Sequence, residues 1–198
     1  MAVYRRPAKQ GQLDGACGFY AIVNALHVLE PELEQKELFY ITLSAFLSDG
    51  NPMGFVDGTR RGTIKNTLSR VISLLNKDYS FTDDKNGTPY QFGFNIPFWI
   101  KDKERNRKTV LDTLSSANYR RGQVCILGYE YCSAERAYNH WTVIKNVRDN
   151  ILMTFDSDEE ARTISLDHAR VDSGQGRNNS RPYNIISGDI FIIYKTEI

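Results

Sequence analysis

Apolar residues in the first half of the chain recur every three or four positions, which is the spacing of one face of an α-helix. The clearest such run extends from Cys17 to about Leu29. The same spacing appears in three further segments, which are Glu32 to about Leu47, Thr63 to Leu75 and Asn106 to Ala117. The pattern therefore predicts that the first half of the chain is helical.

After Gly122 the helical spacing gives way to short runs rich in β-branched and aromatic residues, which are typical of strands. These runs cover residues 124–129, 141–147, 151–155 and 189–194, with turn residues between them. We therefore expect an α+β fold in one domain. A helical lobe would occupy about 1–120, and a lobe with an antiparallel sheet would occupy about 121–198.

Two polar stretches, 82–89 and 172–182, have the composition of exposed loops. Long loops often border binding sites, but they also serve as plain connections. Both roles stay open for these two segments.

The composition is that of a globular protein. The chain has 198 residues, of which 41% are hydrophobic, and its formal net charge is +1. Because nucleic-acid binding needs a surplus of positive charge on one face, no nucleic-acid partner is expected. The first residues lack the apolar core of a signal peptide, and no apolar run approaches the roughly 18 residues of a membrane span. We therefore expect a cytoplasmic protein without a membrane partner, and the oligomeric state stays open.

Cysteine usage directs attention to one thiol. Cys17, Cys125 and Cys132 are odd in number and form no Cys-x-x-Cys pair, so neither a disulfide framework nor a zinc ribbon is indicated, and no metal or cofactor is expected. Cys17 stands at the start of the first predicted helix, and a helix N-terminus with a neighbouring imidazolium favours the thiolate form of a cysteine. Cys17 is therefore the candidate nucleophile, and Gly18 beside it would leave room for a substrate backbone.

A nucleophilic thiol needs a base, and the chain has three histidines. His27 lies about 15 Å further along the Cys17 helix, at 1.5 Å per residue, which is too far for a hydrogen bond. His168 lies in a polar stretch typical of a solvated surface. His140 opens the most apolar strand of the second half, which makes it the candidate base.

The base must itself be oriented by another side chain. Asp156 ends the strand that follows the His140 strand. In a hairpin that turns near residues 148–150, the start of one strand faces the end of the next, so the two side chains should meet. Asp158 is the alternative partner if a bulge shifts the register.

Plain structural roles compete with these assignments. Cys17 is also compatible with a small buried hydrophobic residue on the helix. Cys125 is expected to pack in the core, and Cys132 is expected in a loop before His140 without a special role. Trp141 either lines the cleft beside His140 or packs in the core. The Arg60-Arg61 pair is too short for a basic patch and is interpreted as a solvated face.

The order Gln12, Cys17-Gly18, His140-Trp141-Thr-Val-Ile and Asp156 resembles the papain-like cysteine peptidase superfamily. The pattern is more similar to double-glycine-leader peptidases, Josephin deubiquitinases and phytochelatin synthases than to papain itself. The resemblance covers two short blocks. It departs from papain in having Asp156 where papain has Asn, and in lacking the Cys-Gly-Ser-Cys-Trp run.

This resemblance implies a papain-like fold, with the nucleophile on a helical lobe, the base and its orienting residue on a sheet lobe, and a cleft between them. It also implies that Gln12 stabilises the oxyanion, because the family's Gln lies five or six residues before the Cys; Gln10 fits this spacing less well. Gly18 and Trp141 would lie at the substrate cleft.

The implied activity is that of a cysteine peptidase or isopeptidase that acts on a protein or peptide through a thioester intermediate. A glutamine deamidase, a transglutaminase-like enzyme or a transpeptidase would use the same thiol chemistry. A non-catalytic binding protein of the same fold is the alternative of another class, and retention of Gln12, Cys17, His140 and Asp156 together argues against it.

Overall fold

A computed structural model describes residues 7, 16–48, 55, 58–83, 87–99, 105–157, 163–173 and 178–198. Within these residues the α-helices are α1 (Cys17–Leu29), α2 (Gln35–Leu47), α3 (Arg61–Asp78) and α4 (Arg107–Ser115). Short 3-10 turns cover η2 (Tyr119–Arg121) and η3 (Leu166–His168). All four helices expected from the apolar spacing are confirmed to within a few residues at their ends. None of the described helices is long and apolar enough to cross a membrane.

The described strands form one sheet in the order β1-β2-β8-β3-β4-β5-β6, with β7 paired to β8. Every pairing is antiparallel except that of β7 with β8. Their bounds are β1 Phe81–Thr82, β2 Pro89–Asn95, β3 Gln123–Cys132, β4 Ala137–Arg148, β5 Ile151–Thr154, β6 Thr163–Ser165, β7 Ala169–Val171 and β8 Tyr183–Glu197. The expected combination of helices with an antiparallel sheet is confirmed at the level of an α+β class.

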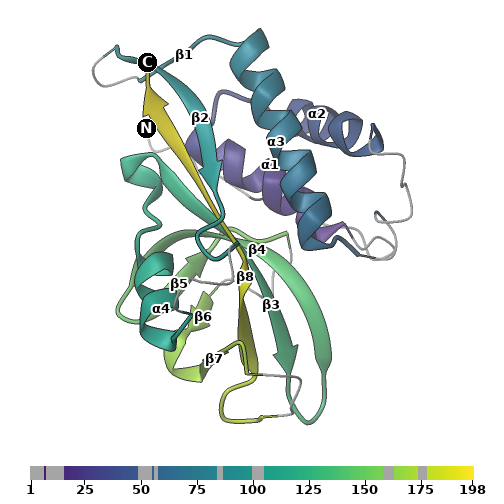
Figure 1. Cartoon of the computed structure of the whole chain (residues 1–198), viewed down its shortest axis with the longest axis vertical. Helices are drawn as coiled ribbons and strands as arrows, with labels where there is room; N and C mark the ends of the chain where they lie inside the picture. The colour runs from purple at the N-terminus through teal and green to yellow at the C-terminus, as the bar shows by residue number, and fades with distance from the viewer. Residues whose placement is uncertain are drawn as a thin grey trace.

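The boundary near residue 120 does not separate helices from strands, contrary to expectation. β1 and β2 precede it, and β2 pairs along its length with β8, the last strand of the chain. β8 runs through much of the length of the molecule and lies between β2 and β3 (Figure 1). The first half of the chain therefore supplies part of the sheet as well as α1, α2 and α3.

Buried side chains form two main clusters. One joins α1 and α3 to the sheet and includes Leu26, Leu68 and Val143. The other joins α4 to alternate residues of the same strands and includes Val110, Leu127 and Ile144. Because successive residues of a strand point to opposite faces, Val143 and Ile144 belong to different clusters. Figure 1 shows α1, α2 and α3 grouped together, with α4 lying apart from them beside the lower strands.

The hairpin of β4 and β5 has the tight turn that the sequence predicts. Asp149 and Asn150 have φ values of 50° and 62°, the left-handed conformation that two-residue hairpin turns require and that Asn and Asp tolerate. The register then shifts between Ile144 and Asn146, where β4 carries a bulge. β5 ends at Thr154, and the chain continues to Asp156 beside β4.

A second irregularity lies where β8 passes β3. Leu127 pairs with Ile190, but Tyr129 pairs with Ile185. The segment 186–189 of β8 therefore lies opposite the single residue Gly128. Bulges of this kind bend a strand and change the direction in which its side chains point.

Candidate active site

Cys17 is the first residue of α1, as expected, and follows the N-cap residue Ala16. The carbonyl of Ala16 accepts hydrogen bonds from the amides of Phe19 and Tyr20 at 2.8 and 3.1 Å, so it closes the first turn. The Cys17 side chain belongs to the cluster beneath α1 and is only 8% exposed. The thiol thus lies at the positive end of a helix dipole, in a largely water-excluded place.

Gly18 is buried against the start of α3. A Cβ added to Gly18 would lie 2.4 Å from Ile64 Cδ1 and 2.8 Å from Thr59 Cβ. A real Cβ could not be accommodated without movement, so the missing side chain lets α1 approach this segment closely. The space that a side chain at position 18 would need is thus already filled by Ile64 and Thr59, inside the protein.

His140 and Asp156 are in contact, as the hairpin argument expects. His140 Nε2 lies 2.8 Å from Asp156 Oδ1, and both residues are buried. The histidine comes from β4 and the aspartate from the segment just after β5. The ring of Tyr129 meets the His140 ring in a T-shaped arrangement with centroids 5.7 Å apart. The imidazole is therefore held by a carboxylate at one nitrogen and by an aromatic wall.

Cys17 completes this arrangement, because His140 also shares a side-chain hydrogen bond with it. Burial by itself would lower the pKa of His140, but hydrogen bonds to Asp156 and Cys17, together with the charges of both groups, raise it to about 10. A pKa of about 10 keeps His140 in its protonated, imidazolium form at neutral pH.

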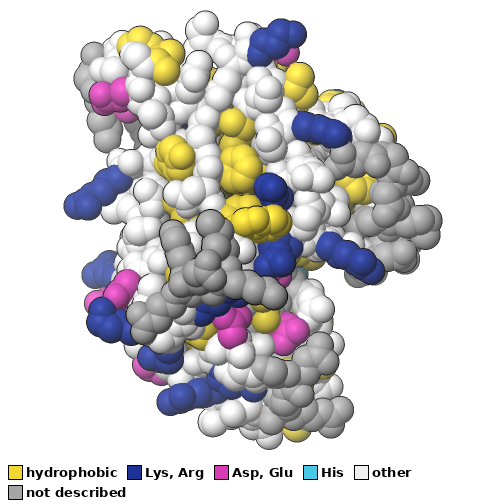
Figure 2. Space-filling view, in the orientation of Figure 1, with side chains coloured by type: hydrophobic (Ala, Val, Ile, Leu, Met, Phe, Trp, Pro, Cys, Tyr) yellow, Lys and Arg dark blue, Asp and Glu magenta, His cyan; other side chains and the backbone are white. Residues whose placement is uncertain are grey.

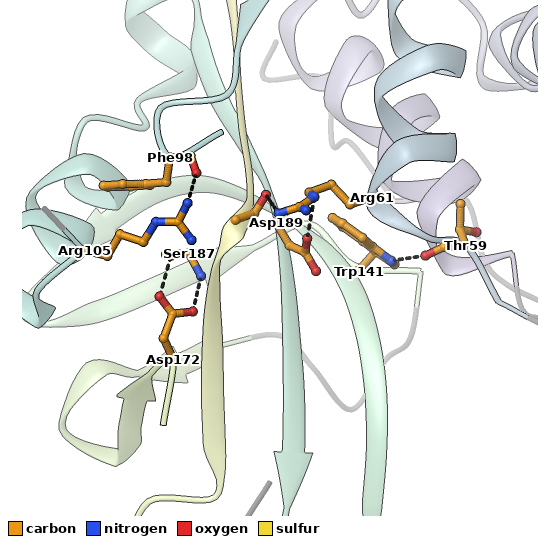
Figure 3. Close-up of polar contacts among 9 residues, drawn as sticks. Thr59, Arg61, Phe98, Arg105, Trp141, Asp172, Ser187 and Asp189 are labelled. Atoms are coloured by element: carbon orange, nitrogen blue, oxygen red, sulfur yellow. Dashed lines mark hydrogen bonds and ion pairs between the residues drawn. The ribbon is translucent and has the colours of Figure 1, made fainter. Parts of the chain in front are cut away.

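Trp141 is buried and belongs to the core cluster beneath α1. Its indole Nε1–H donates to the backbone carbonyl of Thr59 at 2.8 Å, and its ring packs near Phe191 with centroids 6.0 Å apart. It also lines the cavity beside His140. Figure 3 shows the indole reaching from the sheet toward Thr59. Thr59 also contacts Gly18. It therefore links Trp141, which follows His140, to Gly18, which follows Cys17.

A cavity of about 290 Å³ adjoins His140. Its walls come from the segment that leads into α3 and from β3, β4 and β8; among them are Thr59, Arg61, Glu130 and Asp189. Figure 3 shows Arg61 and Asp189 facing each other between the helices and the sheet. Hydrophobic and basic side chains meet near the centre of the face shown in Figure 2, and the outline is hollowed on one side, between its upper and lower parts.

Several other expected residues can be placed. Cys125 is fully buried in β3, as expected, and burial raises the pKa of its thiol. Cys132 is half-buried, but it is the last residue of β3 and not part of a loop, because the strand continues further than its apolar run. His27 Nδ1 lies 3.0 Å from the carbonyl of Leu33, away from the thiol. His168 ends the short turn η3.

Other expectations fall partly or wholly outside the described residues. Gln12, Gln10 and Asp158 lie in segments that the structure does not describe. The loop expected at 82–89 corresponds to the connection between β1 and β2, of which residues 84–86 are not described. The loop expected at 172–182 connects β7 to β8, and residues 174–177 are not described.

Thr59, Arg61 and Asp189 are residues of this site that the sequence did not single out. Arg61 was interpreted as part of a solvated pair, and its side chain is indeed 43% exposed, but it also lines the cavity and faces Asp189. Asp189 was counted as the first residue of an apolar strand. No local pattern marks either residue, because the bulge on β8 that brings them together depends on pairing with a distant strand.

Within the parts of the chain that the structure describes, no group of three or more His, Cys, Asp or Glu side chains could hold a metal ion. The arrangement of Cys17, His140 and Asp156 is suited to nucleophilic chemistry through a thiol. Comparisons of the chain with protein-family models, with curated proteins and with solved structures gave no match.

Proposed function

We propose that this protein is a cysteine peptidase or isopeptidase that uses Cys17 as nucleophile, His140 as acid and base, and Asp156 to orient the imidazole. The observation that carries the proposal is the position of His140 between Asp156, at 2.8 Å, and Cys17. A base held by a carboxylate and hydrogen-bonded to a thiol is the arrangement that activates a nucleophile.

In the proposed reaction the thiolate of Cys17 attacks the carbonyl carbon of an amide. The carbon–nitrogen bond then breaks as protonated His140 gives its proton to the departing amine, which leaves a thioester. Neutral His140 next takes a proton from water, and the resulting hydroxide attacks the thioester. The products are a free carboxylic acid and the regenerated ion pair of Cys17 and His140.

Negative charge that develops on the carbonyl oxygen needs hydrogen-bond donors, each worth about 2.7–4 kcal/mol in comparable enzymes. The backbone N–H of Cys17 is suited to this role because α1 begins there, at the positive end of the helix dipole. Gln12 is the second donor suggested by the resemblance to papain-like peptidases.

The burial of the pair also supports a chemical role. The side chains of His140 and Asp156 are 9% and 1% exposed. Removing charged groups from water costs several kcal/mol per ion, and a hydrophobic pair of similar size often gives a more stable protein. A catalytic requirement explains why such groups are kept in the interior.

The proposal is tested by incubating the purified protein with a diverse peptide mixture and following the products by mass spectrometry. We expect internal cleavage by the wild-type protein and by Cys132→Ala, the matched control, and none by a folded Cys17→Ala variant. Full turnover by Cys17→Ala would overturn the assignment. A small mass gain at glutamine would instead indicate deamidation, and loss of ammonia with joining of two peptides would indicate transfer.

A further inference from the structure

The cavity beside His140 also contains a carboxylate that the proposed mechanism does not use. His140 from β4 and Asp189 from β8 line the same space of about 290 Å³. Cys17 is not itself one of the residues that line this space, but it interacts with His140, which does. Asp189 and the candidate nucleophile are therefore both neighbours of His140.

The fold directs Asp189 toward the cavity through the bulge in β8. The segment 186–189 lies opposite Gly128 alone, and Asp189 occupies the space that a side chain at position 128 would need. A Cβ added to Gly128 would lie 2.7 Å from Asp189 Cβ and 3.1 Å from Trp141 Cζ3. The glycine and the bulge thus act together, since a larger residue at position 128 would displace either the aspartate or the tryptophan.

Arg61 neutralises Asp189 only in part. Its Nε lies 3.9 Å from Asp189 Oδ1, which is longer than a hydrogen bond, while its Nη1 donates to the carbonyl of Gly188 at 3.5 Å. The same guanidinium lies 5.1 Å from the centre of the Trp99 ring. Arg61 therefore divides its contacts among three groups, and the carboxylate keeps capacity for a further cation.

Two further carboxylates, Asp172 and Glu130, add negative charge near Asp189. Asp172 accepts hydrogen bonds from the amide and hydroxyl of Ser187, and Glu130 accepts one from Asn184 Nδ2 at 2.9 Å. Burial raises the pKa of Asp189, whereas the positive charge of Arg61 lowers it. The negative charges of Asp172 and Glu130 raise the pKa further, and together these effects place it at about 6. Asp189 is thus mostly ionised at neutral pH. It shares the cavity with a second carboxylate, Glu130, and with the cationic side chains of Arg60, Arg61 and His140.

We propose that Asp189 is the specificity-determining residue of the site and selects substrates with a lysine or arginine side chain beside the bond that is cleaved. The inference rests on the proposed function, because it assumes that the substrate carbonyl is presented to Cys17. The basic side chain would enter the cavity, where Asp189 is 23% exposed, and place its charged end on the carboxylate. A charge-assisted hydrogen bond of this kind is of the stronger class.

The test uses two peptidyl electrophiles that alkylate an active-site thiol and differ only in one side chain, which is lysine in the first and norleucine in the second. The rate of Cys17 alkylation by each is measured on the full chain by mass spectrometry. For the wild-type protein we expect the lysine reagent to react about tenfold to a hundredfold faster, the ratio that one charge-assisted hydrogen bond supplies. Asp189→Asn should bring the ratio close to one. The matched control is Asp112→Asn, which removes an exposed carboxylate on α4.

The outcomes separate this inference from the proposed function. Equal rates with both reagents on the wild-type protein, or an unchanged ratio in Asp189→Asn, would overturn the role of Asp189 alone. Reaction of Cys17 with neither reagent would overturn the proposed function as well. If Asp189→Asn does not fold, Arg61→Gln replaces it, because removing the internal competitor should raise the preference for lysine. A preference at or below the wild-type value in Arg61→Gln would contradict the proposal.

Discussion

Replacing Gly18 by alanine tests how closely the start of α1, beside the candidate nucleophile, packs against the segment that leads into α3. The new Cβ would lie 2.4 Å from Ile64 Cδ1 and 2.8 Å from Thr59 Cβ. The methyl end of Ile64 can rotate away at small cost. The Cβ of Thr59 is attached directly to the backbone, and the carbonyl of that residue is held by Trp141 at 2.8 Å. The strain therefore falls mainly on Thr59.

The magnitude follows from two opposing effects. Inserting a methyl group into a well-packed interior costs about 1–3 kcal/mol. Alanine in place of glycine in a helix returns up to about 1 kcal/mol, and less than that at the first turn. We therefore expect Gly18→Ala to lower the free energy of unfolding by about 1–2 kcal/mol. For a chain of this size each kcal/mol corresponds to a fall of about 2–4 °C in Tm.

The matched control is Gly62→Ala in the first turn of α3, where an added Cβ has no neighbour within 4 Å. We expect this variant to be as stable as the wild-type protein or slightly more stable. Both variants are compared with the wild-type chain by urea denaturation and by thermal unfolding. Equal stability of Gly18→Ala and Gly62→Ala would refute the packing argument.

Two further expectations concern the residues around His140. Trp141→Phe keeps an aromatic ring, although a smaller one, and removes the indole N–H that donates to the Thr59 carbonyl. We expect it to cost at least about 1–3 kcal/mol in urea denaturation, and no measurable loss would contradict the link between the two residues. Because the pKa of His140 is raised from 6.5 in the unfolded chain to about 10, its contribution to stability is fully present below pH 6.5 and is lost as the pH rises through about 10. The free energy of unfolding, measured from pH 6 to about 10.5, should fall over this range in the wild-type protein and fall less in Asp156→Asn. The same pH dependence in both proteins would contradict the conclusion that Asp156 raises the pKa of His140.

Local spacing was sufficient to predict the four helices, the strands β3, β4 and β5 and the later part of β8, because each of them is marked by its own apolar pattern. β6 and β7, of three residues each, were not predicted, since they are too short to show such a pattern. β2 was missed although its buried residues Tyr90 and Phe92 alternate with exposed ones, since Pro89 and Gly93 interrupt the run. The central position of β8 could not be predicted in the same way. It depends on pairing between the last strand and β2, far away in the sequence, and no local pattern encodes such a contact.

The candidate site likewise has one contact that the sequence predicted and one that it did not. The contact of His140 with Asp156 followed from the length of one hairpin and from a turn marked by Asp149 and Asn150. The contact of Arg61 with Asp189 joins the start of α3 to a bulge in β8, and the bulge arises only when β8 pairs with β3. Residues that act through such distant packing become visible only in the folded chain.

The central claim is that His140 activates Cys17 as a nucleophile. The most direct measurement is the rate at which a small alkylating agent modifies Cys17 at neutral pH, in a Cys125→Ser, Cys132→Ser background where Cys17 is the only thiol in the chain. We expect modification much faster than that of a free model thiol, falling to the model rate or below when His140 is replaced by alanine. A wild-type rate no higher than that of the model thiol, or a rate unaffected by His140→Ala, would contradict the account.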